Sequence, residues 1–195
     1  EAGAAPVLMV LPGALLAVLW ILRNGVEGAI RVTSGLTGLT ALFVLGMALL
    51  ARLRMEFVSP WVMFIPLLVC WVGDSAAYFA GSAFGRHKLC PSISPAKSWE
   101  GFAAGLAGSA AGALAAGSLG AGFAPLSMIL VGIAGGLAAV AGDLLESAMK
   151  RDAGVKDSGA LLPGHGGVLD RFDSLTAAVP VVWLMLLLLG RAGAL

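Results

Sequence analysis

The chain has 195 residues, of which 59% are hydrophobic and 12% are charged, and its formal net charge is +1. Soluble domains usually carry about a quarter of charged residues. This composition, with a mean hydropathy of +0.96, therefore excludes an ordinary soluble domain. We expect an all-α, polytopic integral membrane helix bundle.

A membrane-spanning helix needs about 20 apolar residues to cross a hydrocarbon core of roughly 30 Å. Six segments meet this requirement, and together they predict one transmembrane domain over residues 1–195. Because the chain opens at Glu1 without a methionine, we suspect an N-terminally truncated protein whose earlier spans are missing. The six segments are 6–22, 34–51, 58–83, 101–119, 125–147 and 174–190.

The fourth segment consists almost wholly of Gly, Ala, Ser and Leu. Small residues let membrane helices approach closely, so we interpret it as a packed interior helix. Its glycines at steps of three and four should share one face, whereas a flexible linker is the alternative. These glycines are Gly101, Gly105, Gly108 and Gly112.

The basic residues of the loops predict the orientation. With six spans the loops alternate sides, and lysine and arginine accumulate in cytoplasmic loops. One side receives only Arg52, Arg54 and Arg191. The other side, which we expect to be cytoplasmic, receives Arg23, Arg31, Arg86, Lys88, Lys97, Lys150, Arg151, Lys156 and Arg171.

Three carboxylates, those of Asp74, Asp143 and Glu146, lie inside otherwise apolar segments. An ionisable group within the membrane is costly unless it faces a polar cavity or a partner, so each is a candidate site residue. The helical spacing places Asp143, Glu146, Ser147 and Lys150 on one face.

Simpler interpretations exist for these carboxylates. Glu146 and Lys150 could form an i,i+4 ion pair that needs no ligand. Asp143 has no basic residue one turn away along its helix. Asp74 is equally well a ligand or a partner of Arg86 or His87.

The segment Ser147–Asp173 concentrates eight of the chain's 23 Lys, Arg, Asp and Glu residues. Its basic residues precede a glycine-rich turn, PGHGG, and this combination suits polyphosphate. Asp170 and Asp173 follow at i,i+3, and with Asp143 they could hold a hard divalent cation that prefers oxygen ligands. Helix-terminal charge, a plain turn around His165 and contact with lipid headgroups are the alternatives.

Magnesium ligands and phosphate-binding cations at a membrane edge suggest transfer of a phosphoryl or nucleotidyl group to a lipid. A lipid phosphate is already anionic near neutral pH, so a general base would not be obligatory.

Three motifs resemble phosphatidate cytidylyltransferases (CDP-diacylglycerol synthases). Over all 27 positions, Ser147–Asp173 matches the signature S-x-hydrophobic-K-R-x4-K-D-x-small-x2-hydrophobic-P-x-H-G-G-hydrophobic-x-D-R-hydrophobic-D. GDSAAYFAGSAFGRHKL, Gly73–Leu89, and SPAKSWEG, Ser94–Gly101, resemble two further family segments. The likeness covers roughly residues 60 to 190.

The resemblance implies that CTP and phosphatidic acid react to CDP-diacylglycerol and pyrophosphate with Mg²⁺. It implies Asp143, Asp170 and Asp173 as metal ligands, and a second cation such as K⁺ is associated with this kind of centre. The partners we expect are CTP, phosphatidic acid and membrane lipids, with no nucleic acid and with a homodimer as one option. A bacterial-type inner membrane is the expected location.

The other candidate residues fall into two groups. The first group would bind the triphosphate or the lipid headgroup, or assist the departure of pyrophosphate. It contains Lys150, Arg151, Lys156, Asp157, His165 and Arg171. Arg171 could instead pair with a neighbouring aspartate. The second would contact a substrate and contains Ser94, Lys97, Ser98, Asp74, Glu146 and Ser147.

Two other functions compete with this hypothesis. A CTP-dependent kinase or cytidylyltransferase for an isoprenoid lipid would share the architecture but use another acceptor. An ion-coupled transporter could also place carboxylates within the membrane, but the sequence shows no internal repeat.

Overall fold

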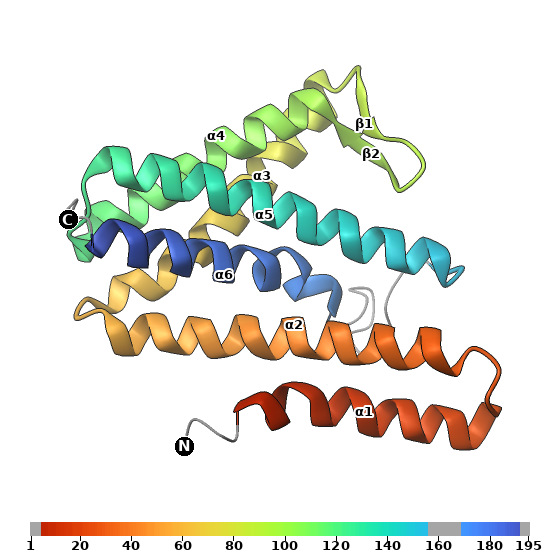
Figure 1. Cartoon of the computed structure of the whole chain (residues 1–195). Helices are drawn as coiled ribbons and strands as arrows, with labels where there is room; N and C mark the ends of the chain where they lie inside the picture. The colour runs from red at the N-terminus through yellow and green to blue at the C-terminus, as the bar shows by residue number, and fades with distance from the viewer. Residues whose placement is uncertain (1–4, 156–168, 192–195) are drawn as a thin grey trace. The chain divides into compact units, whose positions relative to one another are not determined.

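The computed structural model describes residues 5–155 and 169–191, with side chains described for 11–119, 122–155 and 172–189. Within these residues, five helices are long and apolar enough to cross a membrane, and α1 adds a shorter apolar stretch. The predicted all-α membrane bundle is confirmed. The elements are α1 (Ala5–Asn24), α2 (Ala29–Glu56), the 3₁₀-helix η1 (Pro60–Met63), α3 (Phe64–Phe84), β1 (Lys88–Cys90), β2 (Ser94–Ser98), α4 (Trp99–Ala116), the π-helix η2 (Gly117–Ala121), α5 (Pro125–Asp152) and α6 (Leu169–Arg191) (Figure 1).

The chain forms two compact units, Glu1–Ala48 and Leu49–Leu195, and the boundary falls inside α2. In the first unit, α1 and the start of α2 meet at Gly13, where an added Cβ would lie 2.7 Å from the Cα of Thr37. Gly25 and Gly28, with φ of 84° and 76°, form the turn between these helices. The expected single domain and the suspected truncation stay predictions.

Helices α1, α2, α5 and α6 extend further than the predicted spans because polar and charged residues continue them beyond the apolar core, whereas α3 begins later than predicted and α4 ends earlier. The fifth predicted span stops at residue 147, whereas α5 continues to Asp152 and carries Lys150 and Arg151 in its last turn. Basic residues are favourable at a helix C-terminus. Gly154, with φ of 70°, then ends the helix, and the N–H of Val155 donates to the carbonyl of Lys150 at 2.9 Å. This is the Schellman arrangement.

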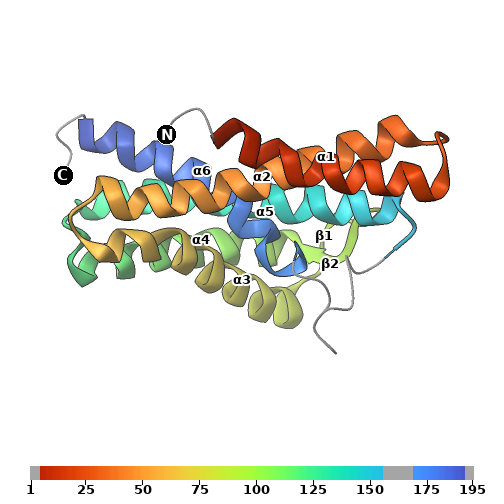
Figure 2. The ribbon, with the colours of Figure 1, turned by 90° about the horizontal axis from the view of Figure 1, so that it is seen from below.

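Helices α3 and α4 run side by side in the second unit (Figures 1 and 2). The four glycines of α4 line one face, as predicted, and this face packs on α3. A Cβ on Gly108 would lie 2.8 Å from the carbonyl oxygen of Val72, and one on Gly112 would collide with the backbone of Leu68. The absence of side chains therefore allows the two backbones to touch.

The same kind of contact joins α4 to α5 and α5 to α6. A Cβ on Gly132 of α5 would lie 2.5 Å from the Cα of Ala110, and one on Gly142 would lie 2.7 Å from the carbonyl oxygen of Asp173 in α6. Ser109 of α4 lies between α3 and α5, and its hydroxyl donates to the carbonyl of Val69 at 2.9 Å. Small residues and one buried hydroxyl thus allow these helices to pack closely.

An apolar cluster fills the end of this unit that is remote from the hairpin. It joins the end of α2, η1 and the apolar parts of α3 to α6, and its fully buried members include Leu53, Ile65, Val131 and Leu186. Glu56 lies beside it and accepts a hydrogen bond from the indole of Trp183 at 2.7 Å. The candidate site residues lie at the other end of the unit, near the hairpin.

We expect Gly112→Ala to destabilise the protein, because its methyl group would collide with the backbone of Leu68. Overpacking of this kind costs about 1–3 kcal/mol. The measurement is the thermal unfolding midpoint in detergent. Gly38→Ala in α2 is the matched control, since a Cβ there meets nothing within 4 Å. An equal loss of stability in both variants would contradict the role of close packing.

Candidate functional site

The C-terminal part of α5 meets the hairpin formed by β1 and β2 at one end of the second unit (Figure 1). Lys97 of β2 forms an ion pair with Asp143, with 2.5 Å between Nζ and Oδ2. Arg151, two turns further along α5, donates from Nε to the carbonyl of Ile93 at 3.4 Å. The basic residues of the hairpin and those at the end of α5, which the loop assignment placed on one side, therefore lie at the same end.

Asp143 is the polar centre of this end. Its second carboxylate oxygen, Oδ1, accepts a hydrogen bond from the hydroxyl of Ser147 at 3.2 Å. The side chains of Lys97 and Asp143 are only 24% and 30% exposed, so the pair is screened less than a surface ion pair. Lys97 is a partner from a distant part of the chain, which inspection of the neighbouring turns of α5 could not find.

The predicted polar face of α5 is confirmed. Ser147 bonds to Asp143, and one turn further Lys150 pairs with Glu146. Glu146 is 4% exposed, which a carboxylate tolerates only when it is paired. The simpler interpretation of Glu146, an i,i+4 ion pair, is therefore what the structure shows.

Three carboxylates on three helices lie close enough to repel one another: Asp74 of α3, Asp143 of α5 and Asp173 of α6. Lys97 attracts Asp74, and Lys150 attracts Asp173. The carboxylate of Asp173 also accepts the N–H of Ser174 at 2.6 Å. This end of the unit is thus an acidic cluster of Asp74, Asp143 and Asp173, offset by two lysines.

For Asp74 we predicted either Arg86 or His87 as a possible partner. The structure gives His87 a different partner. The imidazole of His87 lies 2.6 Å from Glu100 instead. Asp74 is exposed on α3 and interacts electrostatically with Asp143, Asp173 and Lys97. Its alternative role as a ligand stays a prediction.

Among the side chains that the structure describes, no three His, Cys, Asp or Glu residues converge closely enough to hold a metal ion. The predicted ligand Asp170 lies in the first turn of α6, but its side chain is outside the described set, as is that of Arg171. Lys156, Asp157 and His165 also lie outside the described residues. The metal site and these roles therefore stay predictions.

The two predicted serines of the hairpin differ in their surroundings. Ser98 is 3% exposed, and its hydroxyl accepts the N–H of Gly101 at 3.1 Å, which caps α4. Ser94 begins β2 and pairs with Cys90 in the sheet. Ser98 thus has a structural role, and of these hairpin residues Lys97 is the one in contact with the acidic cluster.

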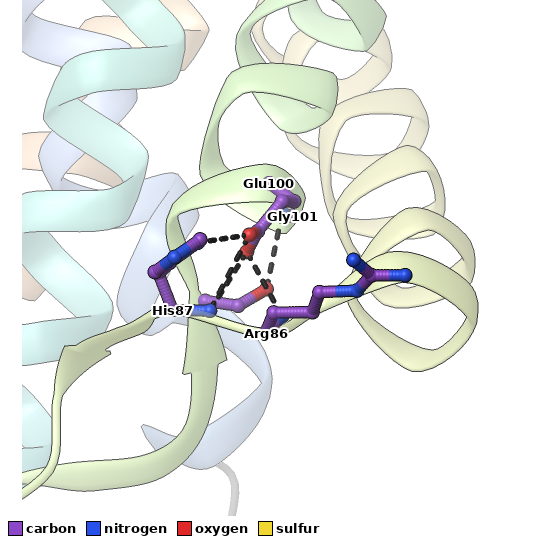
Figure 3. Close-up of polar contacts among 5 residues, drawn as sticks. Arg86, His87, Glu100 and Gly101 are labelled. Atoms are coloured by element: carbon purple, nitrogen blue, oxygen red, sulfur yellow. Dashed lines mark hydrogen bonds and ion pairs between the residues drawn. The ribbon is translucent and has the colours of Figure 1, made fainter.

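Glu100 was not among the predicted site residues, yet it connects the hairpin to α4 (Figure 3). Its carboxylate accepts the N–H groups of Arg86 and His87 at 3.2 and 3.3 Å, besides the imidazole contact. The available signal was the sequence SWEG, in which a capping serine is followed by an acidic residue in the first helical turn.

Comparisons with known proteins place the chain in a family. A family model described as "Cytidylyltransferase family" matches residues 4–189. Proteins named phosphatidate cytidylyltransferase are similar to the chain: one from Haemophilus influenzae is 45% identical over 66% of this chain and 49% of its own length. One from Pseudomonas aeruginosa is 45% identical over 59% and 43%. One from Brucella suis is 48% identical over 60% and 43%.

The chain spans about half the length, or slightly less, of these curated relatives, with 49% and 43% of the first two covered. The family model nevertheless covers almost the whole chain, including the hairpin, the acidic cluster and the signature segment. This chain belongs to the cytidylyltransferase family.

Proposed function

We propose that the chain carries the catalytic part of a phosphatidate cytidylyltransferase, which transfers CMP from CTP to phosphatidic acid. The observation that carries the proposal is the acidic cluster with Lys97 and Lys150, at the end of a membrane bundle whose relatives bear that name. A lipid phosphate and a water-soluble nucleotide can meet only at such a membrane edge.

The reaction exchanges one phosphoanhydride bond for another. A phosphate oxygen of phosphatidic acid bonds to the α-phosphorus of CTP, and the bond from that phosphorus to the bridging oxygen of the β-phosphate breaks. Pyrophosphate leaves with the electron pair. Because the attacking phosphate is already an anion, the chain needs to position the reactants and offset charge rather than remove a proton.

Mg²⁺ is a hard cation that prefers oxygen ligands, so the carboxylates at this end make it the ion we propose. The carboxylates of Asp143 and Asp173 would hold it together with Asp170, and a bound Mg²⁺ would neutralise phosphate charge. A carboxylate has about four lone-pair directions, so Asp143 can accept from Ser147 and Lys97 and still face a cation.

The basic residues would bind the phosphates. Lys97 already lies against Asp143, and Arg151 bonds to the hairpin and to the carbonyl of Val155 at 3.2 Å. Lys156 and His165 belong to the same signature and would complete the phosphate-binding surface, with Asp157 and Arg171 orienting it. Ser147 donates to Asp143, and Glu146 pairs with Lys150 and would hold it in place, whereas the contact of Ser94 with a substrate stays a prediction.

We further propose that this end of the bundle faces the cytoplasm of a bacterial-type inner membrane. The support is the accumulation of basic residues in the segments at this end, since such residues favour the cytoplasmic side. CTP would reach the site from that side. A second cation such as K⁺ and a homodimer stay predictions.

Purified protein should convert CTP and phosphatidic acid to CDP-diacylglycerol and pyrophosphate. We expect Asp143→Asn and Asp173→Asn each to lower turnover by at least about 100-fold, because the loss of a group that only orients a metal ligand already costs about 10- to 100-fold. Glu56→Gln, a carboxamide change beside Trp183, is the control that should keep activity. Release of CDP would instead identify a CTP-dependent lipid kinase, and near-normal turnover of the aspartate variants would refute the metal assignment.

Removal of divalent cations by EDTA should abolish product formation, and added Mg²⁺ should restore it. The physical reason is that the acidic cluster alone repels the CTP phosphates. The measurement is the initial rate against free Mg²⁺. Activity that persists at chelator excess would contradict a Mg²⁺-dependent reaction.

Lys97→Ala should lower kcat/KM for CTP about 10- to 100-fold, because it removes the cation that both orients Asp143 and faces the phosphates. Steady-state kinetics with CTP varied at saturating phosphatidic acid measure this effect. Lys88→Ala, which changes an exposed lysine of β1, is the matched control within the same hairpin. Equal kinetics for the Lys97 and Lys88 variants would show that the Asp143 contact does not matter.

A further inference from the structure

One carboxylate, that of Glu100, fastens the base of the hairpin. Figure 3 shows Glu100 at the start of α4 with contacts to Arg86 and His87, the residues that follow the end of α3. The two backbone N–H groups donate to it at 3.2 and 3.3 Å, and the imidazole of His87 lies 2.6 Å away. The N–H of Trp99 donates to the carbonyl of His87 at 2.9 Å, which adds a backbone hydrogen bond between the same two segments.

The hairpin needs such an anchor because it is short. β1 has three residues and β2 has five, and the pairing is irregular between Lys88 and Cys90. A two-stranded hairpin is at best marginally stable in water. The contacts at its base therefore help to hold its side chains, together with those that Arg151 and Asp143 make to the hairpin.

Close packing makes the same junction rigid. A Cβ on Gly85 would lie 2.7 Å from the hydroxyl of Ser98, and one on Gly101 would lie 3.2 Å from the Cα of Gly81. The end of α3 and the start of α4 are thus in direct contact. Lys97 directly precedes Ser98, and Glu100 directly precedes Gly101, so movement of the base would carry Lys97 with it.

The Glu100 contacts contribute more to position than to stability. The side chain of His87 is 79% exposed, and exposed ion pairs contribute little to folding. The two backbone N–H groups, in contrast, are directional donors to a charged acceptor. They define where the chain leaves α3 and therefore where β2 returns.

We propose that Glu100 is a positioning residue: it fixes the base of the hairpin and thereby sets the reach of Lys97 to Asp143. The inference rests on the proposed function only for its kinetic consequence, since the geometry can be measured without any substrate. Glu100 itself contacts backbone groups and His87, whereas Lys97 contacts the acidic cluster.

The first test measures the hairpin directly. Nitroxide labels at Ser92→Cys, in the hairpin turn, and Asp152→Cys, at the end of α5, report their separation by pulsed electron resonance. Both native cysteines are replaced by Cys70→Ala and Cys90→Ser. We expect one narrow distance distribution, a broad one with Glu100→Ala, and a narrow one with Glu100→Gln, which can still accept both N–H groups.

The second test is kinetic and separates position from general damage. Glu100→Ala should lower kcat/KM for CTP about 10-fold, as expected for a residue that positions Lys97, the partner of the proposed metal ligand Asp143. In a Lys97→Ala background it should have no further effect, because both changes remove the same contact. Glu100→Gln should restore most of the rate.

Glu56→Ala is the matched control, since the Glu56 side chain is 29% exposed against 28% for Glu100 and its partners are Arg52 and Trp183. It should leave the distance distribution narrow. Should Glu100→Ala fail to fold, Glu100→Asp keeps the charge and shortens the reach, and it should broaden the distribution in the same way.

Two results would overturn the proposal: an unchanged distribution in the folded Glu100 variants, or additive effects of the Glu100 and Lys97 changes. A protein without cytidylyltransferase activity whose distribution still broadens on Glu100→Ala would refute the proposed function and leave the positioning role intact.

Discussion

The close approach of helix backbones is the constraint on which the rest of the second unit depends. Glycines of α4 and α5 let α3, α4, α5 and α6 touch without intervening side chains. Asp74, Asp143 and Asp173 come from three of these helices, and their carboxylates interact because the helix axes are so near. Larger residues in place of these glycines would push the helices apart and separate the three carboxylates.

The repulsion between these carboxylates has to be offset, and two lysines from different parts of the chain do this. Lys150 comes from the same helix as Asp143, whereas Lys97 arrives on a hairpin that is inserted between α3 and α4. The hairpin is the part of this end built from strands, so a mostly helical protein uses a short sheet to reach across the bundle. Anchorage by Glu100 makes that reach definite.

Local patterns in the sequence predicted the features that depend on one helix alone, such as which residues share a face. The face of α5 with Asp143 and Ser147 followed from helical spacing, and the glycine face of α4 followed from steps of three and four. The pair between Lys97 and Asp143 could not be predicted, because it joins residues far apart in the chain and depends on the path of the hairpin. Family motifs marked Lys97, but they gave no partner for it.

The buried hydroxyl of Ser109 fixes how far one helix can slide along another. It donates to Val69 of α3, while Gly73 and Gly136 leave room for it on both sides. Sliding α3 by one turn, about 5.4 Å, would bury the hydroxyl without a partner and press it against a side chain. Because Asp74 lies on α3, the hydrogen bond of Ser109 helps to set the position of Asp74 along the bundle relative to the charged side chains of the neighbouring helices.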